Sequence, residues 1–111
     1  MATTTYKILG QSAPSTTSNT DMITVGAAKS QIVSSLVIAN VTAATATARV
    51  FARIAGAAAA VGNAVIYDVS IPAKYRASFT LGITLAATDV LTVQSGTGSA
   101  LTFTAFGTEL A

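Results

Sequence analysis

The stretch that decides the fold is residues 45–54, Thr-Ala-Thr-Ala-Arg-Val-Phe-Ala-Arg-Ile. Every second residue, from Ala46 onward, is apolar, and the residues between them are Thr, Arg or Phe. A period of two places the two sets on opposite faces of a β-strand. We therefore predict a half-buried strand here, with Arg49, Phe51 and Arg53 on its solvent-facing side.

Similar segments extend from this strand toward both ends of the chain. Seven of them have the length and the β-branched or aromatic content of short strands: residues 5–9, 21–25, 32–39, 64–70, 77–85, 90–94 and 100–109. Turn-forming residues such as Gly, Pro, Asn and Ser separate them. This spacing predicts an all-β fold: residues 1–111 form a single-domain antiparallel β-sandwich, jelly-roll or Ig-like, of about eight strands.

Three turns carry more specific expectations. Gly82 falls inside an alternating segment and predicts a bulge or bend there. The glycine-rich residues 95–99 predict a hairpin loop between the last two strands. Residues 57–60 are four alanines, which favour a helical turn, but glycines flank them closely and we prefer a loop.

The alternation also predicts which side chains form the core. The expected core residues are Ile8, Ile32, Leu36, Ile38, Val50, Phe79, Leu81, Ile83, Leu91, Val93 and Phe103. Replacement of a buried leucine such as Leu81 by alanine is then expected to destabilise the protein by about 2–5 kcal/mol.

Composition excludes most chemistry. Of the 111 residues 9% are charged, six basic and four acidic, and Cys, His and Trp are absent. Without Cys and His there is no disulfide, no thiolate or imidazole metal site and no usual general base. The acids, Asp21, Asp68, Asp89 and Glu109, form no recognisable carboxylate pair or calcium loop. We predict no enzyme activity, no cofactor and no metal.

Two uncharged stretches, residues 30–48 and 90–108, have nearly the length of a membrane-spanning helix. Polar residues interrupt both throughout, so we expect no membrane partner. The N-terminus lacks the basic and apolar regions of a signal peptide. We expect the protein to be made and kept in a cytoplasm, or released from it by a route such as lysis.

Basic residues beside aromatic ones are the clearest polar pattern. Arg49 and Arg53 flank Phe51, and Tyr75 lies between Lys74 and Arg76. Such patterns occur in nucleic-acid-binding proteins, but a net charge of +2 provides little attraction, so we expect no nucleic-acid partner. One interpretation is that these side chains are scattered over a solvent-facing surface and bind no partner. The other is that they form a protein interface. The candidate interface residues are Tyr6, Lys7, Arg49, Phe51, Arg53, Tyr75 and Arg76.

The N-terminal segment is interpreted as an arm. Residues 1–5 are expected either to be flexible or to grip a partner, and the main chain of residues 1–7 could add a strand to a neighbouring sheet. With so few charged residues, we expect main-chain pairing and small-residue contacts to hold partners, not salt bridges.

Several sequence segments resemble segments of small structural proteins of tailed bacteriophages. The matching segments are KILGQSAP (7–14), VSSLVIAN (33–40), IPA (71–73), LGITLAATDVL (81–91) and FTAFGTE (103–109). The family's versions include "LGQ-x-AP", "ISSIVVCN", "LGITLAATDVV" and "FSLFGVE", in the same order and spacing. Ala39 stands where the family has Cys, Gly26 stands where it has Pro, and residues 62–68 lack its charged loop.

The resemblance implies a bacteriophage virion structural protein, assembled in the host cytoplasm. We expect a capsid decoration, or cement, protein that binds the outer face of the head. Its expected partners are the major capsid protein and further copies of itself, as a trimer or a dimer. A tail, neck or fibre component is the alternative, and a carbohydrate-binding β-module is a more distant one.

Overall fold

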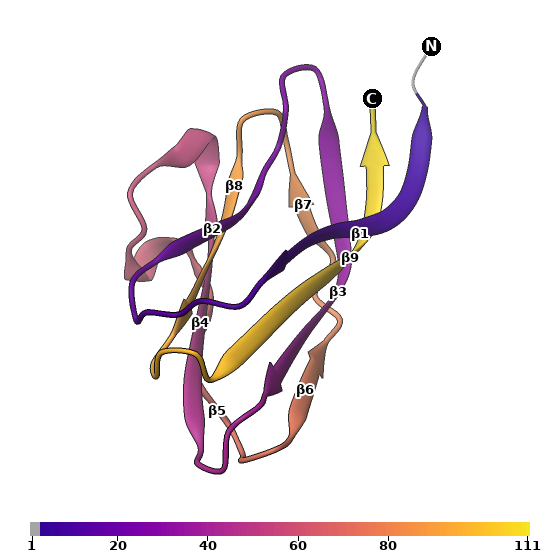
Figure 1. Ribbon diagram of the computed structural model, residues 1–111. Coiled ribbons are helices and arrows are strands. Elements are labelled where there is room, and N and C mark those ends of the chain that lie inside the picture. The colour runs from indigo at the N-terminus through magenta and orange to yellow at the C-terminus, as the bar shows by residue number, and fades with distance from the viewer. Residues whose placement is uncertain (1–2) are drawn as a thin grey trace.

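Two antiparallel sheets packed face to face make up the computed structural model, which describes residues 3–111 (Figure 1). The strands are β1 (Thr4–Ser12), β2 (Thr20–Thr24), β3 (Ser30–Asn40), β4 (Ala46–Arg53), β5 (Ala64–Ile71), β6 (Arg76–Phe79), β7 (Ile83–Leu85), β8 (Val90–Ser95) and β9 (Leu101–Leu110). Two short 3-10 turns, η1 (Ile54–Gly56) and η2 (Val61–Asn63), lie between β4 and β5. The all-β prediction is confirmed.

The order of the strands identifies the sandwich as a jelly roll. Sheet A has the order β1-β9-β3-β6, with β7 also paired to β3, and sheet B has the order β2-β8-β4-β5. Because β6 and β7 both pair with β3 opposite β9, they act as one interrupted strand. The first strand then pairs with the last, the second with the last but one, and so on inward to β4 and β5. This nested pairing distinguishes the jelly roll from the Ig-like alternative.

The predicted hairpin at residues 95–99 is wrong. β8 belongs to sheet B and β9 to sheet A, so this segment carries the chain from one sheet to the other. The crossing packs closely against the β1–β2 connection, where the Ser99 N–H donates to the Pro14 carbonyl at 3.0 Å. A Cβ on Gly98 would lie 2.7 Å from the Ser15 carbonyl oxygen. The glycine therefore permits a close approach between two connections.

Gly82 lies between two strand segments and directly precedes the second. Its φ of +60° is in the left-handed region, and residues 80–82 separate β6 from β7. The predicted bend is confirmed, and it interrupts the strand completely. The four alanines at residues 57–60 lie outside both 3-10 turns and form a loop, as predicted.

Most of the predicted core is buried between the sheets. Leu36, Ile38, Val50, Ile83, Leu91, Val93 and Phe103 belong to the core cluster, and Phe79 packs against it half-buried. Three predictions are wrong, because Ile8, Ile32 and Leu81 are 51%, 40% and 42% exposed.

β-Bulges explain two of these errors. In β3 the register shifts between Val33 and Ser35, so Val33 and Leu36 both face the core although their numbers differ by three. A bulge adds one residue to a strand and reverses the alternation beyond it. Ile32 therefore lies on the outer face of sheet A, whereas Ile38 lies on its inner face. A bulge between Ile8 and Gly10 has the same effect in β1. Leu81 lies in the interruption between β6 and β7.

The first strand, β1, and the C-terminal strand, β9, lie side by side (Figure 1). Thr3 and Ala111 exchange both main-chain hydrogen bonds, at 2.7 and 3.0 Å, and Thr4 pairs with Leu110. Thr3 to Thr5 of the predicted arm are therefore paired with the C-terminal strand, while Met1 and Ala2 lie outside the described residues.

Candidate interaction surface

The seven candidate interface residues occupy three separate regions. Tyr6 and Lys7 lie on β1 of sheet A, and Arg49, Phe51 and Arg53 lie on β4 of sheet B. Tyr75 and Arg76 lie where β6 begins. Through its neighbours on β9 and β3, Tyr6 aligns with Ile32, whereas Arg76 aligns with Ala39. That separation is about 20 Å along β3. The structure does not bring these residues into one patch.

Phe51 is buried, contrary to the prediction of an exposed anchor. It is 4% exposed, yet it is not part of the core cluster between the sheets. The alternation placed it correctly on the outer face of sheet B. The connection from β4 to β5, residues 54–63, folds back over that face, and Ala59, Ala60 and Val61 line a hollow together with Phe51.

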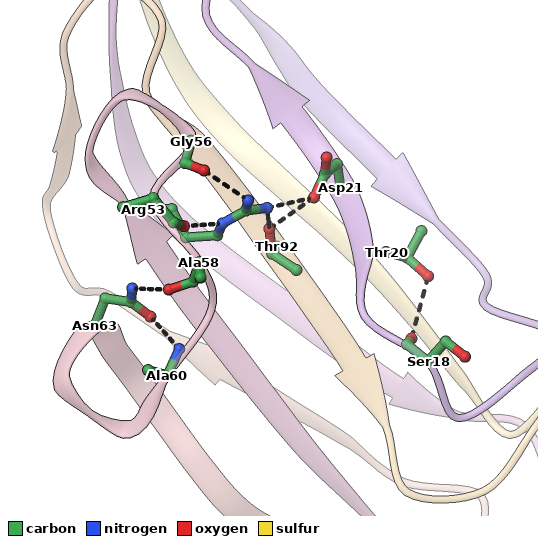
Figure 2. Close-up of polar contacts among 10 residues, drawn as sticks. Ser18, Thr20, Asp21, Arg53, Gly56, Ala58, Ala60, Asn63 and Thr92 are labelled. Carbon is green, nitrogen blue, oxygen red and sulfur yellow. Dashed lines mark hydrogen bonds and ion pairs between the residues drawn. The ribbon is translucent and has the colours of Figure 1, made fainter.

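Arg53 holds this connection in place (Figure 2). Its Nε donates to the Ala57 carbonyl at 2.5 Å and its Nη2 to the Gly56 carbonyl at 2.9 Å. Its Nη1 donates to Oδ1 of Asp21 at 2.8 Å and to Oγ1 of Thr92 at 3.0 Å. The side chain is 18% exposed. All its polar nitrogens thus serve the fold, and Arg53 is a structural residue here.

Two further side chains fasten the same connection. The Asn63 Nδ2 donates to the Ala58 carbonyl at 2.9 Å, and its Oδ1 accepts from the Ala60 N–H at 3.1 Å (Figure 2). Oδ1 of Asp89 accepts from the Ala55 N–H at 2.9 Å. These bonds order a loop whose own alanine side chains offer no polar contacts.

Arg49 is also engaged within the chain. Its Nε and Nη2 donate to the two carboxylate oxygens of Asp68 at 2.5 and 3.1 Å. Its guanidinium carbon lies 4.1 Å from the centre of the Tyr67 ring. The hydrogen bond from Arg49 lowers the pKa of Asp68, and the same bond raises the pKa of Arg49. The guanidinium therefore occupies one face of Tyr67.

Lys7 belongs to a polar cluster at the end of sheet A where the termini meet. Its Nζ lies 3.1 Å from Oε1 of Glu109, and Nε2 of Gln31 donates to Oε2 of Glu109 at 2.8 Å. Lys29 Nζ lies 4.0 Å from Oε1. The hydrogen bonds from Gln31 and then from Lys7 lower the pKa of Glu109.

All four carboxylates of the chain are thus occupied internally. Asp21 binds Arg53, Asp68 binds Arg49, and Glu109 binds Lys7 and Gln31. Asp89 accepts the N–H groups of Ala55 and Ala86. A partner would therefore have to compete with these internal contacts to pair with an acidic side chain.

The outer face of sheet A carries an exposed apolar surface, of which the sequence analysis named only Tyr6 as a candidate interface residue. Tyr6, Ile8, Ile32 and Phe106 lie there, and we call these four residues the sheet A patch. Ile8 pairs with Phe106, and Tyr6 and Ile32 both pair with Thr108. A shallow hollow of about 570 Å³ lies beside Tyr6 and Phe106. One sequence signal pointed to this face: Phe106 is out of phase with the buried Leu101, Phe103 and Ala105.

Within residues 3–111 no helix is long and apolar enough to cross a membrane. No protein-family model and no curated protein sequence matches the chain. Among solved structures, one described as "Structure of infectious bursal disease virus Gx strain" aligns with a TM-score of 0.46 at 11% identity. The alignment covers 98% of this chain but 31% of that one. A superposition of this quality does not separate a shared fold from the general likeness of β-sandwiches.

Proposed function

We propose that this chain is a non-enzymatic structural protein of a bacteriophage virion that binds its partner through the sheet A patch. The observation that carries the proposal is the contrast between this patch and the charged groups. The four carboxylates are occupied internally, whereas Tyr6, Ile8, Ile32 and Phe106 are exposed together. Contiguous exposed apolar areas are typical of contact surfaces, and this supports the proposal.

Within the virion we propose a decoration role, with the major capsid protein as partner. The resemblance of residues 7–14 and 81–91 to phage structural proteins supports the virion setting. The jelly roll is compatible with it, but this fold also occurs in lectin domains and cupins, so it does not select the role by itself. The low charge supports contacts that are apolar and hydrogen-bonded.

The salt dependence of particle binding tests the kind of contact. Particles carrying the chain are washed from low salt to about 1 M, where the Debye length falls to about 3 Å. We expect the chain to stay bound, since screening weakens exposed ionic contacts and leaves apolar contacts intact. Quantitative release at moderate salt would contradict the proposal.

A matched pair of variants tests the surface. Phe106→Asp places a charge in the sheet A patch, and Val65→Asp places one at a similarly exposed position on β5 of sheet B. We expect Phe106→Asp to abolish binding to particles and Val65→Asp to bind normally. The reverse pattern would place the contact on sheet B. Deletion of the N-terminal residues is a poor test, because Thr3 to Thr5 are paired with the C-terminal strand.

The position of a labelled copy in electron micrographs of the particle tests the decoration role against the alternative. Density on the head supports decoration, and density on the tail, neck or fibre supports that alternative. A glycan array addresses the carbohydrate-binding module. Arg49 already covers one face of Tyr67, which leaves fewer aromatic rings free to stack on a sugar.

A further inference from the structure

The four outer edges of the sandwich are protected unequally. The edge formed by β6 and β7 is interrupted at residues 80–82. β2 has a bulge between Asp21 and Ile23, and the register between β5 and β4 shifts twice. Such interruptions discourage an edge strand from pairing with another chain. β1 differs, because its pairing with β9 is regular from Thr4 to Ile8.

The polar main-chain groups of this part of β1 follow a simple alternation. Thr3 and Ala111 exchange both hydrogen bonds, so they form a hydrogen-bonded pair. In an antiparallel ladder such pairs alternate with pairs that are not bonded to each other. Thr5 and Lys7 therefore bond to β9, whereas the N–H and C=O groups of Thr4, Tyr6 and Ile8 point away from it.

Nothing among residues 3–111 pairs with that outward edge. The strand that pairs with β1 is β9, on its other side, and Thr4 to Ile8 are all exposed, with Tyr6 at 82%. Beyond the bulge the situation changes, because Gly10 lies close to Met22 and Ile23 of β2. The free edge is therefore limited to Thr4–Ile8.

We propose that this edge joins two copies of the chain, with the two β1 strands antiparallel about a two-fold axis at Tyr6. Tyr6 then faces Tyr6 of the second copy, and Thr4 faces Ile8 of the second copy. In each of these pairs, the main-chain N–H and C=O groups of both residues point outward. The two residues of a pair therefore exchange both main-chain hydrogen bonds. The outward groups at Thr4, Tyr6 and Ile8 are symmetric about Tyr6. Because the edge is self-complementary about Tyr6, a second copy can use the same five residues to satisfy all of these outward groups at once.

The side chains agree with this register. Tyr6 and Ile8 lie on the outer face, so the two sheet A patches merge into one across the axis, with a cross-strand pair of tyrosines at its centre. Lys7 faces Thr5 of the second copy, so the two lysines are not opposite each other. Glu109 also neutralises Lys7 within each copy. The proposal does not depend on the virion role.

Sedimentation or light scattering of the purified full chain over a range of concentrations tests the dimer. The decisive variant is Tyr6→Pro, since proline removes an N–H that points outward and leaves the bonds to β9 in place. We expect the wild type to dimerise and Tyr6→Pro to raise the dimer Kd by about tenfold or more. Tyr6→Thr keeps the N–H and is the control, expected to remain dimeric. A monomeric or trimeric wild type, or unchanged dimerisation of a folded Tyr6→Pro, would overturn the proposal.

A cross-linking experiment tests the register even if Tyr6→Pro fails to fold. The chain has no cysteine, so Tyr6→Cys introduces a single thiol. Opposed Cα atoms in a hydrogen-bonded antiparallel pair lie about 5.5 Å apart, within the range of a disulfide. We expect Tyr6→Cys to form a disulfide-linked dimer under mild oxidation, and Thr24→Cys on the β2 edge to remain uncrosslinked. Equal cross-linking of the two variants would show random collision and refute the arrangement.

Discussion

Nη1 of Arg53 lies 2.8 Å from Oδ1 of Asp21, so an ion pair connects β4 to the edge strand β2 across β8. Thr92 of β8 donates to the same oxygen at 2.8 Å. The remaining nitrogens of Arg53 hold the carbonyls of Gly56 and Ala57. One side chain thereby orders three strands and the connection that covers Phe51.

Replacement of Arg53 by alanine should therefore affect stability. Arg53→Ala leaves Asp21 unpaired and releases the connection over Phe51, with an expected loss of about 1–3 kcal/mol in the free energy of unfolding. Urea unfolding measures the loss, and limited proteolysis should show cleavage within residues 54–63. Arg76→Ala changes an exposed arginine and should stay within about 0.5 kcal/mol of the wild type. Equal losses in the two variants would contradict the structural role of Arg53.

Two leucines ten positions apart should respond very differently to truncation. Leu91 is fully buried in the core cluster, so Leu91→Ala should destabilise the protein by about 2–5 kcal/mol. Leu81 is 42% exposed, so Leu81→Ala should cost less than about 1 kcal/mol, below the sequence-based expectation. Chemical denaturation of both variants measures the difference. A larger loss for Leu81→Ala would place that residue in the core after all.

Gly107 should tolerate no side chain. A Cβ there would overlap the Ile32 carbonyl oxygen of β3 and contact Leu9 of β1. Since the clash is with main chain, Gly107→Ala should destabilise by about 1–3 kcal/mol or more. Gly62→Ala is the control, because a Cβ at Gly62 meets nothing within 4 Å. Thermal unfolding of both variants checks the prediction, and similar melting temperatures would contradict it.

The polar cluster at the termini predicts a loss of stability in acid. The pKa of Glu109 is lowered in the folded chain by hydrogen bonds from Gln31 and Lys7. Its contribution is therefore fully present above the unfolded pKa of about 4.3, and it disappears as the pH falls through the lower folded pKa. Thermal unfolding followed from neutral pH into this acidic range should show a declining midpoint.

Glu109→Gln should flatten that decline, because the substituted residue does not titrate. Asp68, whose pKa Arg49 lowers, should account for part of the decline in the unfolding midpoint that remains in Glu109→Gln. Adding Asp68→Asn should reduce this decline further. An unchanged pH dependence in Glu109→Gln would show that the cluster does not stabilise the folded state.

Local pattern was sufficient to locate most of the strands. The predicted segment at residues 45–54 corresponds to β4 (Ala46–Arg53), and that at 64–70 corresponds to β5 (Ala64–Ile71). Alternation and turn residues act over a few neighbouring positions, so the sequence reveals them directly. The outer position of Phe51 followed from the same pattern, whereas its burial by residues 54–63 did not.

By itself, the sequence determined the all-β class, the number of strands within one, most of the core and the shortage of charges. The tertiary structure decided the jelly-roll order, the crossing of residues 96–100 between sheets and the faces of Ile8 and Ile32. It also decided that Arg49 and Arg53 bind within the chain. The physical reason is range: alternation is local, but a bulge, a crossing or an ion pair between strands depends on which distant segments become neighbours.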